Sequence, residues 1–135
     1  MIVVDSSALI AILFDEPERP AMEAVIAGSE PCVMSAVNAH ETASVLRARH
    51  GPDAVERFWG FLTACEIEIV PFDEAQVHIA AVAFDQYGKG LHPRARLNLS
   101  DCAAYALAKT CAAPLLFKGD DFTHTDLQSA LSLSP

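Results

Sequence analysis

The chain has 135 residues, the usual length of one domain, so we expect a single domain over residues 1–135. Its hydrophobic content of 52% suffices for an independent core and excludes a disordered acidic chain. The 18 acidic and 9 basic residues give a formal net charge of −9, which excludes a protein that coats nucleic acid with a broadly basic surface. Nucleic acid stays open as a substrate at a metal site, because a bound cation reverses the local charge.

The sequence favours a cytoplasmic protein that does not enter a membrane. Its longest apolar segment, residues 102–117, is interrupted by Lys109 and Pro114 and is shorter than the roughly 20 residues of a membrane-spanning helix. The N-terminus lacks the basic region of an export signal. The four cysteines show no C-x-x-C spacing, so we expect them to be reduced core residues.

Short β-branched or apolar segments alternate with segments of helical periodicity. In chain order we predict a strand over 1–4, helices over 8–14 and 21–27, a strand over 32–34, helices over 36–49 and 53–64, a strand over 66–70, a helix over 73–87, a loop over 88–99, a helix over 101–111, a strand over 115–117 and a short last strand within 127–135. Ser35, Asp73 and Ser100 are the expected N-caps of three of these helices. This alternation predicts an α/β protein with a short, mainly parallel sheet flanked by helices.

Acidic residues break apolar segments near the places where such a sheet binds ligands. Ligand sites of parallel sheets form beyond the carboxyl ends of the strands. Asp5 follows the first strand, and Asp120 and Asp121 follow a late one. Asp101 opens a helix directly after a loop, and Glu41 lies in a helical segment with few other charges. Each acid alone is compatible with a helix cap, a solvated position or a turn, but the topology brings three of these places to one edge of the sheet.

Carboxylates that share a cleft repel one another unless a cation lies between them. Oxygen ligands at that density suit Mg²⁺ or Mn²⁺ rather than zinc. Such an ion orients a water molecule, lowers the pKa of that water and stabilises the charge that develops on a phosphodiester under attack. The acidic residues therefore indicate metal-assisted hydrolysis.

Several motifs resemble those of a known nuclease family. Asp5-Ser6-Ser7-Ala8-Leu9 is similar to the opening of PIN-domain nucleases. YGKGLHP at residues 87–93 with LNLSDC at 97–102 resembles the VapC toxins of bacterial toxin–antitoxin pairs, as does LLFKGDDF at 115–122 with TDL at 125–127. The resemblance covers the whole chain in order, and it implies a three-layer α/β PIN fold.

The resemblance also implies an activity and the residues that carry it. The activity is that of a metal-dependent endoribonuclease, in which a metal-activated water leaves 5′-phosphate and 3′-hydroxyl ends. The family pattern places Asp5, Glu41 and Asp101 at the catalytic positions that bind Mg²⁺, for which Mn²⁺ can substitute. Ser6 is expected to steady the site or contact RNA through its hydroxyl.

The fourth acidic position differs from the family pattern. Many members carry Thr-x-Asp-x-Asp-Phe at this strand end, whereas this sequence has Phe117 and Gly119 in place of the threonine and the first aspartate. Asp121 then matches the aspartate before the phenylalanine, and Asp120 is an additional acid that could substitute for the missing one. Both aspartates are kept as candidates for the catalytic site, with Asp121 as the metal ligand.

A basic segment lies between two candidate acids. Lys89, Arg94 and Arg96 occur between Asp85 and Asp101 with no acidic residue among them. The segment is compatible with a solvated loop, or with contacts to RNA phosphates beside the cleft. The second interpretation confines positive potential to one side of an acidic protein.

The resemblance implies partners as well. These are an RNA substrate, a cognate VapB-like antitoxin that blocks the cleft, and a second copy of the chain in a homodimer. Phe58, Trp59 and Leu62 share one face of a predicted helix and are expected in the core, although part of that face could form the antitoxin groove.

Two other functions are weighed against the nuclease. A PIN-like module that binds RNA or a partner without cutting would show the same sequence pattern, since metal geometry decides the activity. A receiver-like phosphotransfer domain also gathers acids at strand ends, but it requires paired acids in the first loop, where Asp5 stands alone.

Overall fold

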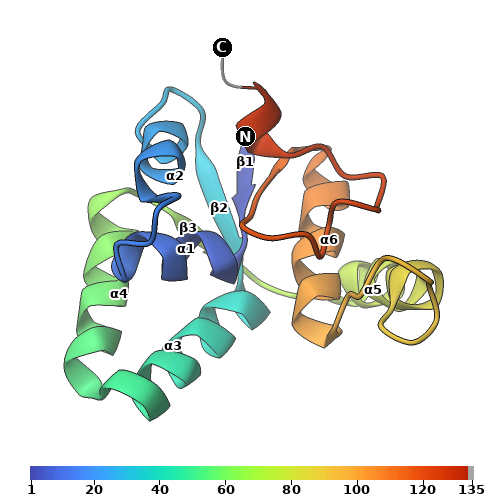
Figure 1. The fold of residues 1–135 in the computed structure, drawn as a ribbon, viewed down its shortest axis with the longest axis horizontal. Helices are drawn as coiled ribbons and strands as arrows, with labels where there is room; N and C mark the ends of the chain where they lie inside the picture. The colour runs from blue at the N-terminus through green and yellow to red at the C-terminus, as the bar shows by residue number, and fades with distance from the viewer. Residues whose placement is uncertain (134–135) are drawn as a thin grey trace.

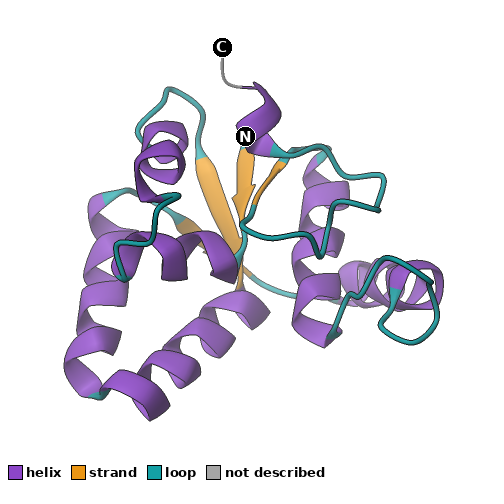
Figure 2. Ribbon diagram, in the orientation of Figure 1, coloured by secondary structure: helices purple, strands orange, loops and turns teal. Residues whose placement is uncertain are grey.

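The computed structural model describes residues 1–133 and places a parallel sheet between two layers of helices (Figures 1 and 2). The sheet has four strands in the order β3-β2-β1-β4. Their bounds are Ile2–Val4 for β1, Cys32–Ser35 for β2, Glu68–Val70 for β3 and Leu115–Leu116 for β4. Every pair of neighbouring strands is parallel, with Val3 of the central β1 opposite Val33 and Leu115. The predicted α/β architecture is confirmed.

The helices divide between the two faces of the sheet. They are α1 (Ser6–Leu13), α2 (Arg19–Ile26), α3 (Ala36–His50), α4 (Pro52–Ala64), α5 (Glu74–Tyr87), α6 (Leu99–Cys111) and a short 3-10 helix (Ala130–Leu133). Figure 1 shows α1, α2, α3 and α4 on one side of the strands and α5 with α6 on the other. This arrangement produces the three layers that the sequence predicts.

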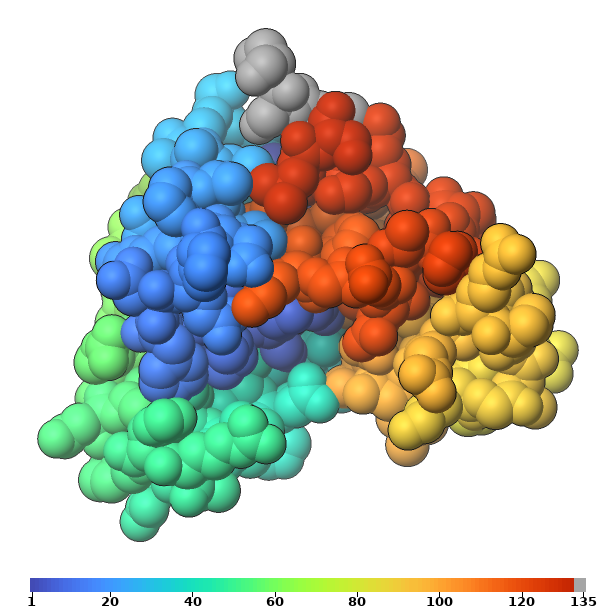
Figure 3. Space-filling view, in the orientation of Figure 1, coloured from blue at the N-terminus to red at the C-terminus, as the bar shows by residue number. Residues whose placement is uncertain are grey.

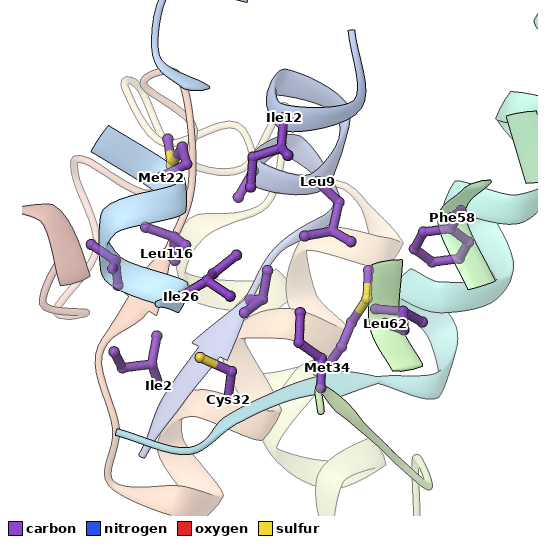
Figure 4. Packing of buried hydrophobic residues seen from close by; sticks show 14 of the residues in the cluster. Ile2, Leu9, Ile12, Met22, Ile26, Cys32, Met34, Phe58, Leu62 and Leu116 are labelled. Carbon is purple, nitrogen blue, oxygen red and sulfur yellow. The ribbon is translucent and has the colours of Figure 1, made fainter. Parts of the chain in front are cut away.

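Two hydrophobic cores lie on opposite faces because successive residues of a strand point in opposite directions. Ile2 and Val4 of β1 contribute to the core beneath α1, α2 and α4, whereas Val3 contributes to the core beneath α5 and α6. Figure 4 shows the first core, where side chains of these helices surround strand residues; it labels Ile2, Leu9, Ile12, Met22, Ile26, Cys32, Met34, Phe58, Leu62 and Leu116. The cores fix how the helices that carry the acidic residues lie over the strand ends.

Two of the three predicted N-caps are confirmed. The Ser35 hydroxyl oxygen accepts a hydrogen bond from the Val37 amide at 3.3 Å, at the start of α3. The Asp73 carboxylate accepts one from the Gln76 amide at 3.0 Å, at the start of α5. Each side chain satisfies a backbone donor that the first turn of a helix leaves unpaired.

The prediction that Ser100 caps α6 is wrong. The N-cap is Asn98, whose side-chain oxygen accepts from the Asp101 amide at 2.8 Å, while the Asp101 carboxylate accepts from the Asn98 amide at 3.0 Å. This reciprocal pair satisfies two backbone donors at once, which a serine two residues later cannot do. Helix α6 therefore begins at Leu99, and the Ser100 hydroxyl is directed elsewhere.

Most element boundaries differ from the predictions by one or two residues, and three of these differences have a clear local form. Helix α2 starts at Arg19 because Pro20 fits the first turn of a helix, where no backbone N–H is needed. Strand β3 starts at Glu68, since Glu66 has a left-handed backbone with φ of 54°. Strand β4 is limited to Leu115 and Leu116.

The last predicted strand, within residues 127–135, is not formed in the part of the tail that the structure describes. Residues 130–133 form the 3-10 helix, and only Ser129 makes an isolated bridge, to Leu115. Residues 134 and 135 of that prediction lie outside the described residues. The four cysteines are free, with Cys32 and Cys102 buried. Within residues 1–133 every helix falls short of the length and apolarity that crossing a membrane requires.

Candidate active site

The candidate site lies where β1 and β2 end and where α1, α3 and α6 come together (Figure 1). Asp5 directly follows β1, and α3 directly follows β2. Helix α6 is joined to α3 by the Asn38 side-chain amide, which donates to the Ser100 carbonyl at 3.0 Å. Figure 3 shows a notch in the molecular surface between α3 and the start of α6.

Asp5 is the N-cap of α1 and is almost completely buried, with 4% of its surface exposed. One of its oxygens, Oδ2, accepts from the Ser7 amide at 3.0 Å and from the Ser7 hydroxyl at 2.5 Å. The Ser7 hydroxyl oxygen in turn accepts from the Lys118 amide at 3.0 Å, just after β4. Burial raises the pKa of Asp5 against the effect of the Ser7 hydrogen bonds, and the charge of Glu41 raises this pKa further.

Asp101 is also buried, with 9% of its surface exposed, although it occupies the first turn of α6. Burial raises its pKa to about 7, and the hydrogen bond from the Asn98 amide offsets only part of that effect. The charges of Asp5, Asp121 and Glu41 raise this pKa as well. Coulomb interactions weaken with distance, so these four acids act on one another as neighbours. We call Asp5, Glu41, Asp101 and Asp121 the electrostatic group.

Glu41 reaches this group from the second turn of α3 and is half-buried. The Ser100 hydroxyl lies 2.5 Å from Glu41 Oε2 and 2.9 Å from the side-chain oxygen of Asn98. With its single proton it links the carboxylate of α3 to the first turn of α6. The serine that was expected to cap α6 therefore positions an acidic residue of the site.

Of the two neighbouring aspartates after β4, Asp121 contributes to the electrostatic group, since its charge raises the pKa of Asp101. Both side chains are exposed, and the loop is anchored by the buried ring of Phe122. The Asp120 carbonyl accepts from the Thr123 amide at 3.1 Å, so Asp120 belongs to a turn.

Asn38 is a residue of the site region that the sequence reasoning missed. It is 1% exposed, and its backbone carbonyl accepts from the hydroxyls of Ser6 at 3.2 Å and Thr42 at 2.7 Å. Together with its amide bond to Ser100, these contacts join α1, α3 and α6. A polar residue one turn before Glu41, in an otherwise apolar stretch, was the available signal.

Ser6 lies at the site, but its hydroxyl is engaged with α3. It lines a pocket of about 260 Å³ together with Ser7, Glu41 and Lys118. The Lys118 ammonium group donates to Glu16 at 2.9 Å and lies 3.4 Å from Glu18, so its charge is compensated at the edge of this pocket.

The donor set fits a hard divalent cation. The acids of the group supply carboxylate oxygens, the ligands that Mg²⁺ and Mn²⁺ prefer, and their mutual repulsion would be relieved by a cation. Among residues 1–133, however, no three acidic, histidine or cysteine side chains are gathered closely enough to form a ready ligand cage. The acids therefore lie near one another, but their side chains are not close enough together to surround a metal ion.

The basic segment lies in the loop between α5 and α6. Lys89, Arg94 and Arg96 are exposed, whereas Ala95 and Leu97 are completely buried. Leu97 directly precedes the Asn98 cap, so the loop leads into the first turn of α6 that carries Asp101.

The chain is similar over its length to proteins of one family. The family model described as PIN domain matches residues 2–127. The chain is 42% identical over 125 residues to ribonuclease VapC30 of Mycobacterium tuberculosis, covering 93% of this chain and 95% of that protein. It is also 42% identical over 125 residues to a ribonuclease VapC of Mycolicibacterium smegmatis, covering 93% and 96%.

Solved structures with the same fold include toxins. A structure of Mycobacterium tuberculosis VapC20, described as a sarcin–ricin loop cleaving toxin, matches with a TM-score of 0.76 at 15% identity, covering 94% of this chain and 96% of that one. A toxin–antitoxin complex from Klebsiella pneumoniae matches with a TM-score of 0.69 at 18% identity, covering 93% of both chains. At these identities the likeness shows the shared fold.

Proposed function

The chain belongs to the PIN domain family, and from this premise we propose that it is a metal-dependent endoribonuclease that acts as the toxin of a VapBC-type toxin–antitoxin pair. Relatives at 42% identity that are named ribonucleases support RNA as the substrate. The observation that carries the proposal is the electrostatic group of Asp5, Glu41, Asp101 and Asp121, which separate elements bring to one edge of the sheet.

In the proposed site these four acids hold Mg²⁺, with Mn²⁺ as a substitute. When bound, the ion lowers the pKa of a water molecule and stabilises the charge that develops on the phosphodiester. Cleavage is proposed to leave 5′-phosphate and 3′-hydroxyl ends. Since the carboxylates are not closed into a cage, loading the site requires their side chains to move closer together.

The surrounding hydrogen bonds support this role because they orient Asp5, Glu41 and Asp101 each through one oxygen. Ser7 holds Asp5 through Oδ2, and the Asn98 amide holds Asp101 through Oδ2. Ser100 holds Glu41 through Oε2. The second oxygen of each carboxylate is then available to a ligand, and the donors also stabilise the charged forms that metal binding needs.

RNA is proposed to lie along the notch, with its phosphates near Lys89, Arg94 and Arg96. These side chains are exposed on a loop that continues into α6, so they supply cations beside an otherwise acidic cleft. The Ser6 hydroxyl already donates to the Asn38 carbonyl, so it is not free to contact RNA. The proposed role of Ser6 is therefore to shape the pocket that it lines together with Glu41.

The antitoxin and the second copy of the chain are proposals on the same basis. Similar folds occur in a toxin–antitoxin complex, which supports an antitoxin partner. Phe58 and Leu62 are core residues, whereas 39% of the Trp59 surface is exposed at a hollow that Ile67 and Ile69 also line. This hollow is the part of the α4 face that remains open to an antitoxin segment.

A PIN-like module that binds without cutting is the second candidate. The specific observation in its favour is the departure at the fourth acidic position, where Phe117 and Gly119 replace the family's threonine and first aspartate.

A cleavage assay separates the two candidates. The purified chain is incubated with RNA in Mg²⁺, in Mn²⁺ and in excess EDTA, together with the variants Asp5→Asn and Asp101→Asn. We expect the unaltered protein to cleave only with metal and neither site variant to cleave, while both site variants keep their circular dichroism. Asp85→Asn, which removes an exposed acid of α5, is the matched control and should cleave normally. Full activity of either site variant in EDTA would refute the mechanism.

A further inference from the structure

Residues 88–97, here called the basic loop, have a defined shape. The loop is closed at its base, where the Lys89 amide donates to the Leu97 carbonyl at 3.0 Å and the Leu97 amide donates to the Tyr87 carbonyl at 3.1 Å. Ala95 is completely buried between the exposed Arg94 and Arg96. Both guanidinium groups therefore extend from the solvent side of one anchored segment.

The side chain of His92 holds the middle of this loop. Its Nδ1 accepts hydrogen bonds from the Arg94 amide at 2.9 Å and from the Ala95 amide at 2.8 Å. The His92 amide donates to the Gly88 carbonyl at 3.1 Å, and its ring lies 6.0 Å from the ring of Tyr87. An Nδ1 that accepts carries no proton, so the geometry assigns the neutral form with hydrogen on Nε2.

We propose that His92 is a positioning residue for RNA, because its Nδ1 fixes the backbone that presents Arg94 and Arg96 to phosphates. This inference rests on the proposed function. The arrangement corresponds to an Asx turn, in which a side-chain acceptor binds amides two and three residues ahead. Without the acceptor, two amides beside a buried alanine lose their partner and the loop visits other conformations. Affinity for a ligand falls by the fraction of molecules in the competent conformation.

Rescue by asparagine provides a readout that a purely packing role would not show. An asparagine side-chain oxygen accepts hydrogen bonds as Nδ1 does, whereas asparagine lacks the ring that lies near Tyr87.

The test uses the full chain in EDTA, so that RNA is bound and not cut. Binding of a fluorescent single-stranded RNA is measured by anisotropy for the unaltered protein, His92→Ala and His92→Asn. Hydrogen exchange of the Arg94 and Ala95 amides is measured by NMR for the same proteins. An asparagine oxygen can accept in place of Nδ1. His78→Ala, which removes an exposed histidine of α5, is the matched control.

We expect His92→Ala to weaken RNA binding roughly fivefold and to accelerate exchange of the two amides, and His92→Asn to restore both. His78→Ala should follow the unaltered protein throughout.

Other outcomes would refute either the role of His92 or the proposed phosphate contacts. If His92→Asn binds as weakly as His92→Ala, the role of Nδ1 is refuted. If exchange accelerates while RNA binding is unchanged, His92 shapes the loop without positioning RNA, which also overturns the inference. The double variant Arg94→Ala with Arg96→Ala tests the premise separately. If it binds RNA with unchanged affinity and salt dependence, the proposed phosphate contacts themselves are wrong.

Discussion

Replacing Asp101 by asparagine is expected to stabilise the metal-free protein while it abolishes cleavage. The buried carboxyl has a pKa of about 7 instead of 3.8, so keeping it charged in the folded protein is unfavourable. At about 1.36 kcal/mol for each pKa unit, this difference corresponds to about 4 kcal/mol. Asparagine retains an oxygen that accepts from the Asn98 amide, so the capping of α6 persists. We expect a net gain of about 2 kcal/mol above neutral pH, or roughly 5–10 °C in melting temperature.

The stability that Asp101→Asn gains over the unaltered protein should increase with pH. Between pH 3.8 and about pH 7 the folded protein holds the Asp101 proton more tightly than the unfolded chain does. The free energy of unfolding of the unaltered protein therefore falls as pH rises through this window and levels off above it. The advantage of Asp101→Asn should accordingly be small near pH 4 and complete near pH 8.

Urea denaturation in EDTA at these two pH values, followed by circular dichroism, measures the difference. Asp85→Asn serves as the control for removing a negative charge from the surface, and it should change the midpoint little. If Asp101→Asn is no more stable than the unaltered protein near pH 8, the buried charge is not a cost to folding and the reasoning fails.

Three further predictions concern the hydrogen bonds and acids around the site. Ser100→Ala removes the hydroxyl that holds Glu41, and cleavage should need roughly threefold more Mg²⁺; an unchanged Mg²⁺ titration would show that Glu41 needs no such support. Asp121→Asn should lose cleavage while Asp120→Asn keeps it, because the charge of Asp121 raises the pKa of Asp101 whereas Asp120 belongs to a turn. The opposite result in a rate assay would assign the fourth position to Asp120. Tyr105→Phe removes the hydrogen bond of 2.7 Å that the Tyr105 hydroxyl donates to Asp126, in the segment after β4. This change should lower the free energy of unfolding by about 1 kcal/mol. A urea midpoint equal to that of the unaltered protein would contradict this.

The elements and their order could be predicted from the sequence because their causes are local. Strands appear as short β-branched segments, and helices as periodic apolar positions after capping residues. Ser35 and Asp73 cap the expected helices because a cap involves only the next two or three residues. Alternation of strands and helices then limits the topology to a parallel sheet, whose strand ends gather Asp5 and its acidic neighbours.

The assignment of Ser100 failed because Asn98 and Ser100 both offer a side-chain oxygen to the unpaired backbone donors of the first turn of α6. Sequence shows two polar candidates two residues apart, and only the folded first turn decides which one binds. Once Asn98 takes the cap, the Ser100 hydroxyl is free to bind Glu41, a residue 59 positions earlier in the chain.

Burial of the acids was likewise decided by tertiary packing. Asp101 and Asp5 are charged residues that the sequence could equally place at exposed helix starts, and their raised pKa values arise from the helices packed over them. Asn38 and His92 act through contacts that no local pattern specifies. Local sequence thus determined which elements form and which chemical groups this protein carries, whereas packing between distant segments decided which of those groups meet, because solvent exposure and Coulomb interactions depend on distances in space rather than along the chain.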